Sequence, residues 1–303
     1  MNNESQQSIA VRAIKHAIPY IRLYKGATFV IKAGGAVFNS DASAREFVEQ
    51  VATIHQLGIN TVVVHGGGPQ SDELSTALGI VPEYVAGRRV TDSRSLELSA
   101  MVLNGSVNTQ LLALCRDLGV RAIGMSGIDA GLVRATRRPP VEVGNGADTA
   151  TVDYGHVGDI VSVDTSALSQ LLQDGIVPVI SPLSADDDGR LLNINADTVA
   201  AELAIGLAAE KLIIVSSPAG LLDDPDDPDT LISYLDSDEL QSRERSGKIK
   251  GGMLPKVAAV KRAINNGVPR VHLISYRVPD SLLLEVFTNE GSGTLVVQTK
   301  TSG

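Results

Sequence analysis

The sequence is poor in three features that would each point to a particular class of protein: cysteine, positive charge and long apolar runs. Cys115 is the single cysteine, so we expect no disulfide framework and no cysteine-based metal cluster, and a thiol packed within a helix. This composition fits a reducing cytoplasm. Lysine and arginine number 26 against 35 aspartates and glutamates, a formal charge of −9 that argues against nucleic acid as a partner.

No stretch reaches the roughly 18 apolar residues that a membrane span needs. Residues 1–17 are polar and lack the apolar core and cleavage site of a secretory signal. The sequence therefore predicts neither export nor a membrane span. With 303 residues the chain has ample length for one large domain or two modest ones.

Glycine, by contrast, is concentrated where two predicted strands end. Val62–His65 leads into Gly66–Gly68, and Phe29–Lys32 leads on to Gly34 and Gly35. Without Cβ atoms the backbone can approach a ligand closely, and the amides at the start of a following helix point at it. We expect a cradle for negatively charged oxygens between the two turns, although glycine turns after buried strands are also common for structural reasons. Neither run fits the dinucleotide fingerprint or the Walker spacing.

From residue 28 onward the hydrophobic pattern alternates between strand and helix, which predicts an α/β fold with parallel strands covered by helices on both faces. Ligands of such folds bind beyond the carboxyl ends of the strands, where Lys32 and the glycine turns lie. The predicted strands are 28–32, 61–65, 176–181, 211–216, 271–274 and 294–297, and the predicted helices are 42–57, 70–78, 93–118, 163–174, 196–207 and a last one ending at 266.

Three segments depart from this alternation. Residues 8–23 have apolar positions at helical spacing before the first strand, with Pro19 expected to break or kink the helix. Short pieces between 120 and 160 predict hairpins that add antiparallel strands to the sheet. The acidic loop 223–229 contains prolines and lacks the spacing of a calcium loop, so a solvated turn is favoured over a metal site.

Several polar residues are candidates for a site, each with a structural alternative. Arg88 and Arg89 precede a helix; they form a solvated turn, or one of them binds a substrate carboxylate. Asn193, Asn195 and Asp197 alternate at a strand end; they form a helix cap, or they line the site at the same sheet edge as the glycines. His156 has no partner at a recognisable spacing, so we do not expect it to be catalytic.

These groups suit the transfer of a phosphoryl group, in which catalysis is mostly positioning and charge neutralisation. No serine–histidine pair, cysteine nucleophile or histidine metal cluster is evident. Lys32 and Lys256, the latter one turn inside a helix that follows a glycine loop, would supply positive charge together with a magnesium ion. If the acceptor is a carboxylate, its pKa of roughly 4.3 leaves it ionised at neutral pH, and no general base is needed.

Five ordered motifs give the chain a resemblance, nearly end to end, to the N-acetylglutamate kinases of the amino acid kinase family. The motifs are Val30-Ile31-Lys32-x-Gly34-Gly35, His65-Gly66-Gly67-Gly68-Pro69-Gln70, Gly87-x-Arg89-Val90-Thr91-Asp92, Asn193-x-Asn195-Ala196-Asp197 and Gly251-Gly252-Met253-x-Pro255-Lys256. The resemblance implies transfer of the γ-phosphoryl group of ATP, with Mg²⁺, to the side-chain carboxylate of N-acetyl-L-glutamate, the second step of arginine biosynthesis.

The resemblance also implies roles for individual residues. Lys32 and Lys256 would stabilise the transition state, with Asp197 orienting both. The implied acceptor-binding residues are Gly67, Gly68, Arg89, Asn193 and Asn195; the phosphate-binding residues are Gly34, Gly35 and Gly66; and the nucleotide-binding residues are Ser217, Gly220, Leu221, Lys248 and Lys250.

The implied fold is a three-layer α/β/α open sheet, with an acceptor lobe at 1–208 and a nucleotide lobe at 209–303. The N-terminal helix resembles that of hexameric, arginine-inhibited members, which predicts a homodimer or homohexamer. Ser275-Tyr276 replaces the Asp-Gly pair usual in those members, Ser217 replaces a usual aspartate, and Arg88 replaces an apolar residue. Arginine inhibition, docking of a nitrogen-regulatory protein, a related acylated or carrier-linked acceptor such as aminoadipate, and a catalytically weak ligand-binding role therefore stay open.

Overall fold

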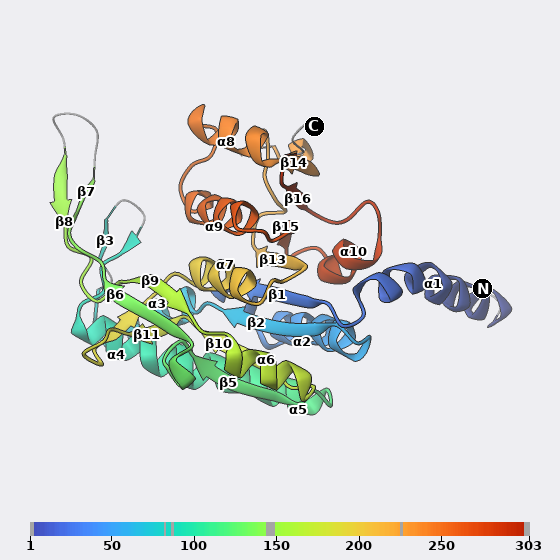
Figure 1. Ribbon diagram of the computed structural model, residues 1–303, viewed down its shortest axis with the longest axis horizontal. Helices are drawn as coiled ribbons and strands as arrows, with labels where there is room; N and C mark the ends of the chain where they lie inside the picture. The colour runs from blue at the N-terminus through green and yellow to red at the C-terminus, as the bar shows by residue number, and fades with distance from the viewer. Residues whose placement is uncertain (1–2, 82, 86–87, 144–148, 225–226, 300–303) are drawn as a thin grey trace.

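The computed structural model describes residues 3–81, 83–85, 88–143, 149–224 and 227–299. Gly87 of the third motif and Pro225-Asp226 of the acidic loop lie outside these ranges. A central sheet runs through the molecule with helices packed on both of its faces (Figure 1). This architecture confirms the predicted three-layer α/β/α fold class.

The central sheet has eight strands in the order β14-β16-β15-β13-β1-β2-β10-β5. The six strands from β15 to β5 are parallel to one another. Strand β16 runs antiparallel to β15, and β14 pairs with β16 in parallel, so β14 and β16 both run against the other six strands. In sequence order the strands are β1 (Thr28–Ala33), β2 (Asn60–His65), β5 (Ala122–Ser126), β10 (Val177–Ser181), β13 (Lys211–Ser216), β14 (Tyr234–Asp236), β15 (Arg270–Ser275) and β16 (Thr294–Val297).

Alternate side chains of β1 enter two separate hydrophobic cores. Phe29 and Ile31 pack toward α2 (Asp41–Gln56), α5 (Asn108–Asp117) and α10 (Ser281–Phe287). Val30 packs toward the opposite face, against α7 (Ala196–Gly206) and α9 (Met253–Asn265). This period-two division follows from the pleat of a strand buried on both faces. The second face is covered by α6 (Ser166–Gln173), α7 (Ala196–Gly206), α8 (Ser237–Arg245) and α9 (Met253–Asn265).

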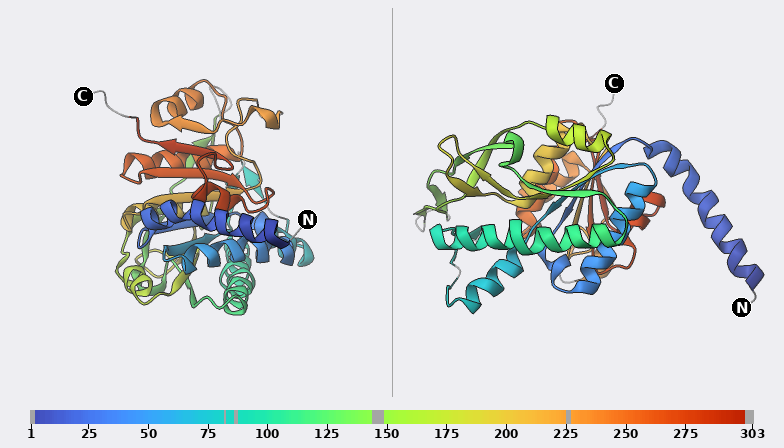
Figure 2. Two further views of the ribbon diagram at one scale, coloured as in Figure 1. Left: turned by 90° about the vertical axis from the view of Figure 1, so that its right-hand side faces the viewer. Right: turned by 90° about the horizontal axis from the view of Figure 1, so that it is seen from below.

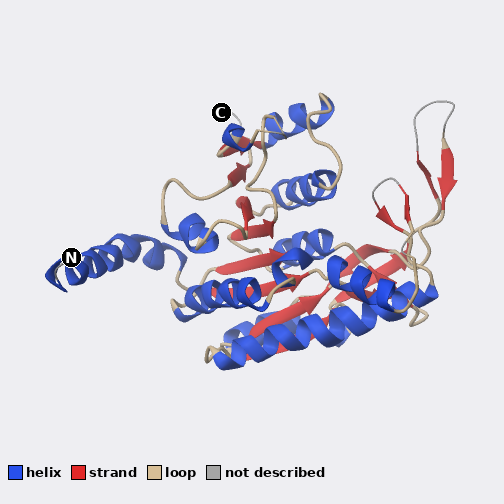
Figure 3. Cartoon of the chain, turned by 180° about the vertical axis from the view of Figure 1, so that it is seen from behind, coloured by secondary structure: helices blue, strands red, loops and turns tan. Residues whose placement is uncertain are grey.

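The predicted antiparallel addition to the central sheet is wrong in its placement. The piece nearest the sheet, β5, is a parallel edge strand, and the antiparallel pieces form separate sheets. These are a four-stranded sheet of β6 (Val133–Arg137), β9 (Gly158–Val163), β11 (Leu183–Ala185) and β12 (Leu191–Asn193), and the hairpins β3–β4 (Tyr84–Val85, Arg88–Arg89) and β7–β8 (Val141–Val143, Ala150–Val152). Both hairpins lie at the end of the molecule away from α1 (Figure 3).

The predicted helix 93–118 is one continuous helical stretch in three parts: α4 (Ser93–Ala100), the π-helical η2 (Met101–Val107) and α5. Its length and hydropathy meet the criteria for a membrane span, and 44% of the apolar window is buried within the protein. Leu111 and Cys115 on its inner face join the core beside α2. This packing accounts for the apolar composition, and the thiol is buried as expected.

The N-terminal helix α1 (Asn3–Tyr24) projects from the body of the molecule (Figure 2). Pro19 lies inside it without ending it, so of the two effects expected of this proline, a break or a kink, the break does not occur. Apolar side chains on this helix are exposed: Ile9, Val11, Ile14 and Leu23 have between 52% and 65% of their surface accessible. The remaining elements are α3 (Gly68–Ala77) and the short turns η1 (Gly35–Phe38), η3 (Asp129–Gly131) and η5 (Pro228–Thr230).

Candidate active site

Lys32 and Lys256 meet on one carboxylate, although 224 positions separate them in the sequence. The Lys32 Nζ lies 2.7 Å from Asp197 Oδ1, and the Lys256 Nζ donates to Asp197 Oδ2 at 3.0 Å. Lys32 comes from the carboxyl end of β1, Asp197 from the first turn of α7 and Lys256 from the first turn of α9. The side chains are 6%, 5% and 16% exposed, so this triad is largely shielded from water.

The triad carries one more positive charge than negative charge. Burial would by itself raise the pKa of Asp197, but the two ammonium groups outweigh it and hold the pKa below its usual value. Burial lowers the pKa of Lys32, while Asp197 opposes that shift by stabilising the charged form. The result is a buried cluster that attracts an anion at its open side.

Asn195 positions Asp197 at the start of α7. Its Oδ1 accepts hydrogen bonds from the backbone amides of Asp197 at 2.8 Å and Thr198 at 3.2 Å, which makes it the helix N-cap. The capping interpretation is therefore correct for Asn195, and the cap also places the carboxylate between the lysines. Asn193 ends β12 next to it, with its backbone amide bonded to the carbonyl of His156 at 2.8 Å.

The two glycine turns pack directly against each other. A Cβ added to Gly35 would lie 2.7 Å from Pro69 Cδ and 3.0 Å from the Cα of Gly67. Gln70 links the turns by donating from Nε2 to the Gly35 carbonyl at 2.9 Å. The glycines therefore permit a close approach between two segments that follow neighbouring parallel strands.

Not all of these amides can serve an anion as predicted. The amides of Gly34 and Gly66 already donate to the carbonyls of Val215 at 3.0 Å and Ala33 at 2.9 Å. Gly35 and Gly68 instead begin η1 and α3, where amides have no acceptor within the helix. The amides that the turns leave available to an anion are therefore those at these two helix starts.

A cavity of about 540 Å³ opens beside the triad. All five residues predicted to bind nucleotide line it, together with Gly34, Gly35 and Lys256; the five are Ser217, Gly220, Leu221, Lys248 and Lys250. Sequence reasoning missed Arg243 and did not place Tyr276 in this wall. Among the described residues that line it, four are cationic and none is a carboxylate. Among the described residues, no group of three or more His, Cys, Asp or Glu side chains could hold a metal ion.

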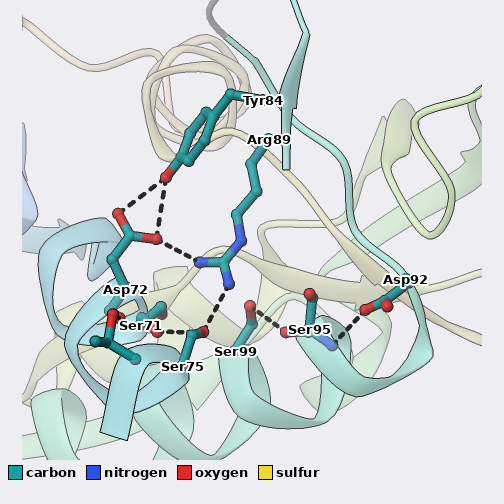
Figure 4. Close-up of polar contacts among 9 residues, drawn as sticks. Ser71, Asp72, Ser75, Tyr84, Arg89, Asp92, Ser95 and Ser99 are labelled. Carbon is teal, nitrogen blue, oxygen red and sulfur yellow. Dashed lines mark hydrogen bonds and ion pairs between the residues drawn. The ribbon is translucent and has the colours of Figure 1, made fainter. Parts of the chain in front are cut away.

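Arg89 lies on the hairpin β3–β4 and is already bound within the chain (Figure 4). Its Nη1 donates to Asp72 Oδ1 and its Nη2 donates to Ser75 Oγ, both at 2.9 Å. The side chain is 13% exposed. The solvated-turn alternative is therefore wrong for Arg89, and Asp72, which no sequence signal marked, is its carboxylate partner.

His65, next to the second turn, has a structural role that the motif did not reveal. Burial lowers its pKa to about 4, so the ring is neutral at pH 7. Its Nε2 lies 3.1 Å from Asn108 Nδ2, and its Nδ1 lies 3.2 Å from the Gly66 carbonyl oxygen. With its proton on Nδ1 the ring donates to the Gly66 carbonyl and accepts from the Asn108 amide at Nε2. The ring then holds the second glycine turn against the start of α5.

Comparison with known proteins gives a consistent result. Residues 27–275 match the sequence model of the amino acid kinase family. The chain is 47% identical over 288 residues to an acetylglutamate kinase from Myxococcus xanthus, with 94% of each chain covered. It is 42% identical over 299 residues to an acetylglutamate kinase from Symbiobacterium thermophilum, covering 98% of this chain and 100% of that one.

Among solved structures, the fold is similar to that of N-acetylglutamate synthase from Neisseria gonorrhoeae complexed with coenzyme A and N-acetyl-glutamate. The TM-score is 0.82 at 28% sequence identity, and the match covers 96% of this chain and 64% of the synthase. The similarity thus includes nearly all of the described fold and about two thirds of the other protein.

Proposed function

The chain belongs to the amino acid kinase family, and on that premise we propose that it transfers the γ-phosphoryl group of ATP to the side-chain carboxylate of N-acetyl-L-glutamate. The product is an acyl phosphate, and the reaction is the second step of arginine biosynthesis. The observation that carries this proposal is the pair of lysines on one buried carboxylate beside a cation-lined cavity. The acetylglutamate kinases to which the chain is 42–47% identical support the choice of acceptor.

In this reaction an anionic nucleophile approaches an anionic phosphate, so the main task of the protein is charge neutralisation. Lys32 and Lys256 take that role, and Asp197 holds both ammonium groups toward the same point. The acceptor carboxylate is ionised at pH 7 and attacks phosphorus directly, while ADP leaves. No group of the protein has to remove a proton.

ATP occupies the cavity, with its phosphates toward Gly35 and Lys256 and its remaining part toward Ser217, Gly220, Leu221, Lys248 and Lys250. It enters as its magnesium complex. A bound magnesium ion would supply charge neutralisation at the phosphate oxygens of ATP, and Lys256 and Lys32 on Asp197 would neutralise the same charge from the side of the protein.

The acceptor lies on the other side of the triad, with its α-carboxylate on Arg89 and its acylated amine near Asn193. Gly67 and Gly68, at the start of α3, offer backbone amides to the acceptor on this side. A related acylated or carrier-linked acceptor would use the same contacts, so the acceptor has to be identified by comparison of substrates.

The remaining features concern assembly and location. The exposed apolar side chains Ile9, Ile14 and Leu23 on the projecting helix α1 support assembly through this helix into a homodimer or a homohexamer. The reaction uses ATP and a soluble amino acid, which supports a cytoplasmic location. A nitrogen-regulatory protein would dock on the part of the chain between 209 and 303.

The test is an assay in which hydroxylamine traps the acyl phosphate. N-acetyl-L-glutamate, N-acetyl-aminoadipate and glutamate are compared at equal magnesium-ATP, with and without arginine. We expect the highest kcat/KM with N-acetyl-L-glutamate. A higher value with aminoadipate would reassign the acceptor, and no product with any acceptor, together with no calorimetric binding of ATP at millimolar concentration, would exclude the kinase.

A further inference from the structure

The hairpin that carries Arg89 is tied to α3 through one carboxylate (Figure 4). Asp72 accepts a hydrogen bond from Arg89 Nη1 at 2.9 Å, and its two oxygens lie 3.0 and 2.9 Å from the hydroxyl of Tyr84. Tyr84 and Arg89 are directly opposite each other in the antiparallel pair β3–β4, so their side chains leave the same face. Asp72 therefore accepts hydrogen bonds from both side chains of this cross-strand pair.

A second acceptor on α3 completes the fixation of the guanidinium group. Ser75 lies three residues after Asp72, on the same face of the helix, and its Oγ accepts from Arg89 Nη2 at 2.9 Å. The Ser75 hydroxyl donates to the Ser71 carbonyl at 2.7 Å, which turns an oxygen lone pair toward the arginine. Contacts at two nitrogens of a planar group determine the orientation of its plane.

Part of the donor capacity of Arg89 is unused. The guanidinium has five N–H groups, and its Nε is buried without a hydrogen-bond partner among the described residues. Two residues further along, Thr91 Oγ1 is also buried without a partner in the described chain. Buried donors and acceptors are ordinarily paired, so the Arg89 Nε–H and, separately, the Thr91 hydroxyl are hydrogen-bonding groups that a polar ligand would satisfy.

We propose that Asp72 is a positioning residue for the acceptor: with Ser75, it holds the Arg89 guanidinium so that the edge formed by Nε and Nη2 receives the α-carboxylate. This inference rests on the proposed function of Arg89. A carboxylate that binds along one edge of a guanidinium forms two parallel hydrogen bonds, and this geometry requires the plane to be fixed beforehand. Tyr84 assists by holding Asp72 in place.

The kinetic test compares Asp72→Ala, Asp72→Asn and Tyr84→Phe with the unchanged protein. The alanine variant should raise the KM for the acceptor about tenfold or more, the size expected for loss of a charge-assisted hydrogen bond, with little change in the KM for ATP or in kcat. Asparagine keeps an acceptor oxygen and should restore part of the loss, and Tyr84→Phe should have a smaller effect. Asp187→Ala is the matched control, because Asp187 holds Arg134 on the exposed surface.

A second measurement does not depend on turnover. Phenylglyoxal modifies accessible arginines, and mass spectrometry of peptides gives the rate for Arg89 alone. Asp72→Ala should speed modification of Arg89 at least several-fold, whereas Asp187→Ala should leave that rate unchanged. An unchanged Arg89 rate, or an acceptor KM that is unchanged or falls, would overturn the positioning role; a falling KM would mean that Asp72 competes with the acceptor.

The two measurements separate this inference from the proposed function. If the unchanged protein phosphorylates N-acetyl-L-glutamate and Asp72→Ala has the same acceptor KM, the inference is wrong and the proposed function stands. If the unchanged protein phosphorylates no acceptor, the proposed function is wrong, and with it the acceptor on which the positioning role rests. The rate of Arg89 modification then still decides whether Asp72 holds the guanidinium.

Discussion

Two buried lysines lie toward opposite ends of neighbouring strands and differ in what surrounds the ammonium group. Lys32 comes near the carboxyl end of β1, and Lys211 is the first residue of β13 beside it. As whole residues they are 5% and 3% exposed. Lys32 contacts Asp197 at 2.7 Å, whereas the Lys211 Nζ lies 4.8 Å from the centre of the Tyr24 ring and has no ion pair within 4.0 Å among the described residues.

Burial and a lowered pKa therefore do not by themselves identify a lysine of the site. Burial lowers the pKa of both side chains, that of Lys211 to about 8. Lys32 differs because it shares a carboxylate with a second lysine and lies near the end of a strand that leads into a glycine turn beside a cavity. Its position at the carboxyl edge of the sheet distinguishes it, as the topology of α/β folds predicts.

The largest expected effect comes from removing the carboxylate that the triad shares. Asp197→Asn leaves two buried ammonium groups without compensating charge, so we expect the free energy of unfolding to fall by about 3–5 kcal/mol, measured by urea denaturation. The control Asp187→Asn disrupts an exposed pair and should cause no measurable change. A stability equal to that of the unchanged protein would mean that the triad is not a coupled buried cluster.

Replacing each lysine in turn tests whether Lys32 contributes to catalysis and Lys211 does not. Lys32→Met should lower kcat by roughly 10²–10³, the scale for loss of a preorganised charge donor, because Asp197 stays paired with Lys256 and the fold is retained. Lys211→Met, equally buried, should leave kcat within about twofold. Equal losses in the two variants would remove the distinction between the two ends of the sheet.

A smaller effect is the pH dependence of stability that Lys211 contributes. The folded-state pKa of Lys211 is lowered to about 8, below its unfolded value, so between these two values the unfolded chain binds more protons and stability rises with pH. From about pH 7.5 to about pH 9.5 the unchanged protein should gain about 1–2 kcal/mol relative to Lys211→Met. Urea denaturation at the two pH values measures this, and parallel curves for the two proteins would contradict it.

Local patterns in the sequence predicted most of the fold. The strands at Lys211–Ser216 and Thr294–Val297 begin and end at the predicted residues, and most other elements differ by one or two residues at an end. Apolar alternation and glycine punctuation are local signals, which explains this success. The pairing partners of 120–160 are a non-local property, and the predicted antiparallel strands were therefore assigned to the wrong sheet.

The residues of the site likewise fall into those that local motifs predicted and those that depend on non-local contacts. The motifs around Lys32, Asp197 and Lys256 predicted residues that the structure brings into direct contact, because strand ends and helix starts meet at one edge of a parallel sheet. The partner of Arg89 could not be predicted, because Asp72 lies outside the motif that opens α3 and its contact with the hairpin β3–β4 is a non-local property. Arg243 likewise reaches the cavity from α8 without a local signal.

In the proposed mechanism the two lysines act on the transferring phosphoryl group rather than on nucleotide binding as such. The most direct measurement is calorimetric binding of ADP, magnesium, fluoroaluminate and N-acetyl-L-glutamate, a mimic of the transition state, to the unchanged protein and to Lys32→Met. We predict that Lys32→Met weakens this complex by roughly 10²–10³ while magnesium-ADP alone binds as before. Equal affinity of the two proteins for the mimic, or an equal loss for ADP alone, would contradict the account.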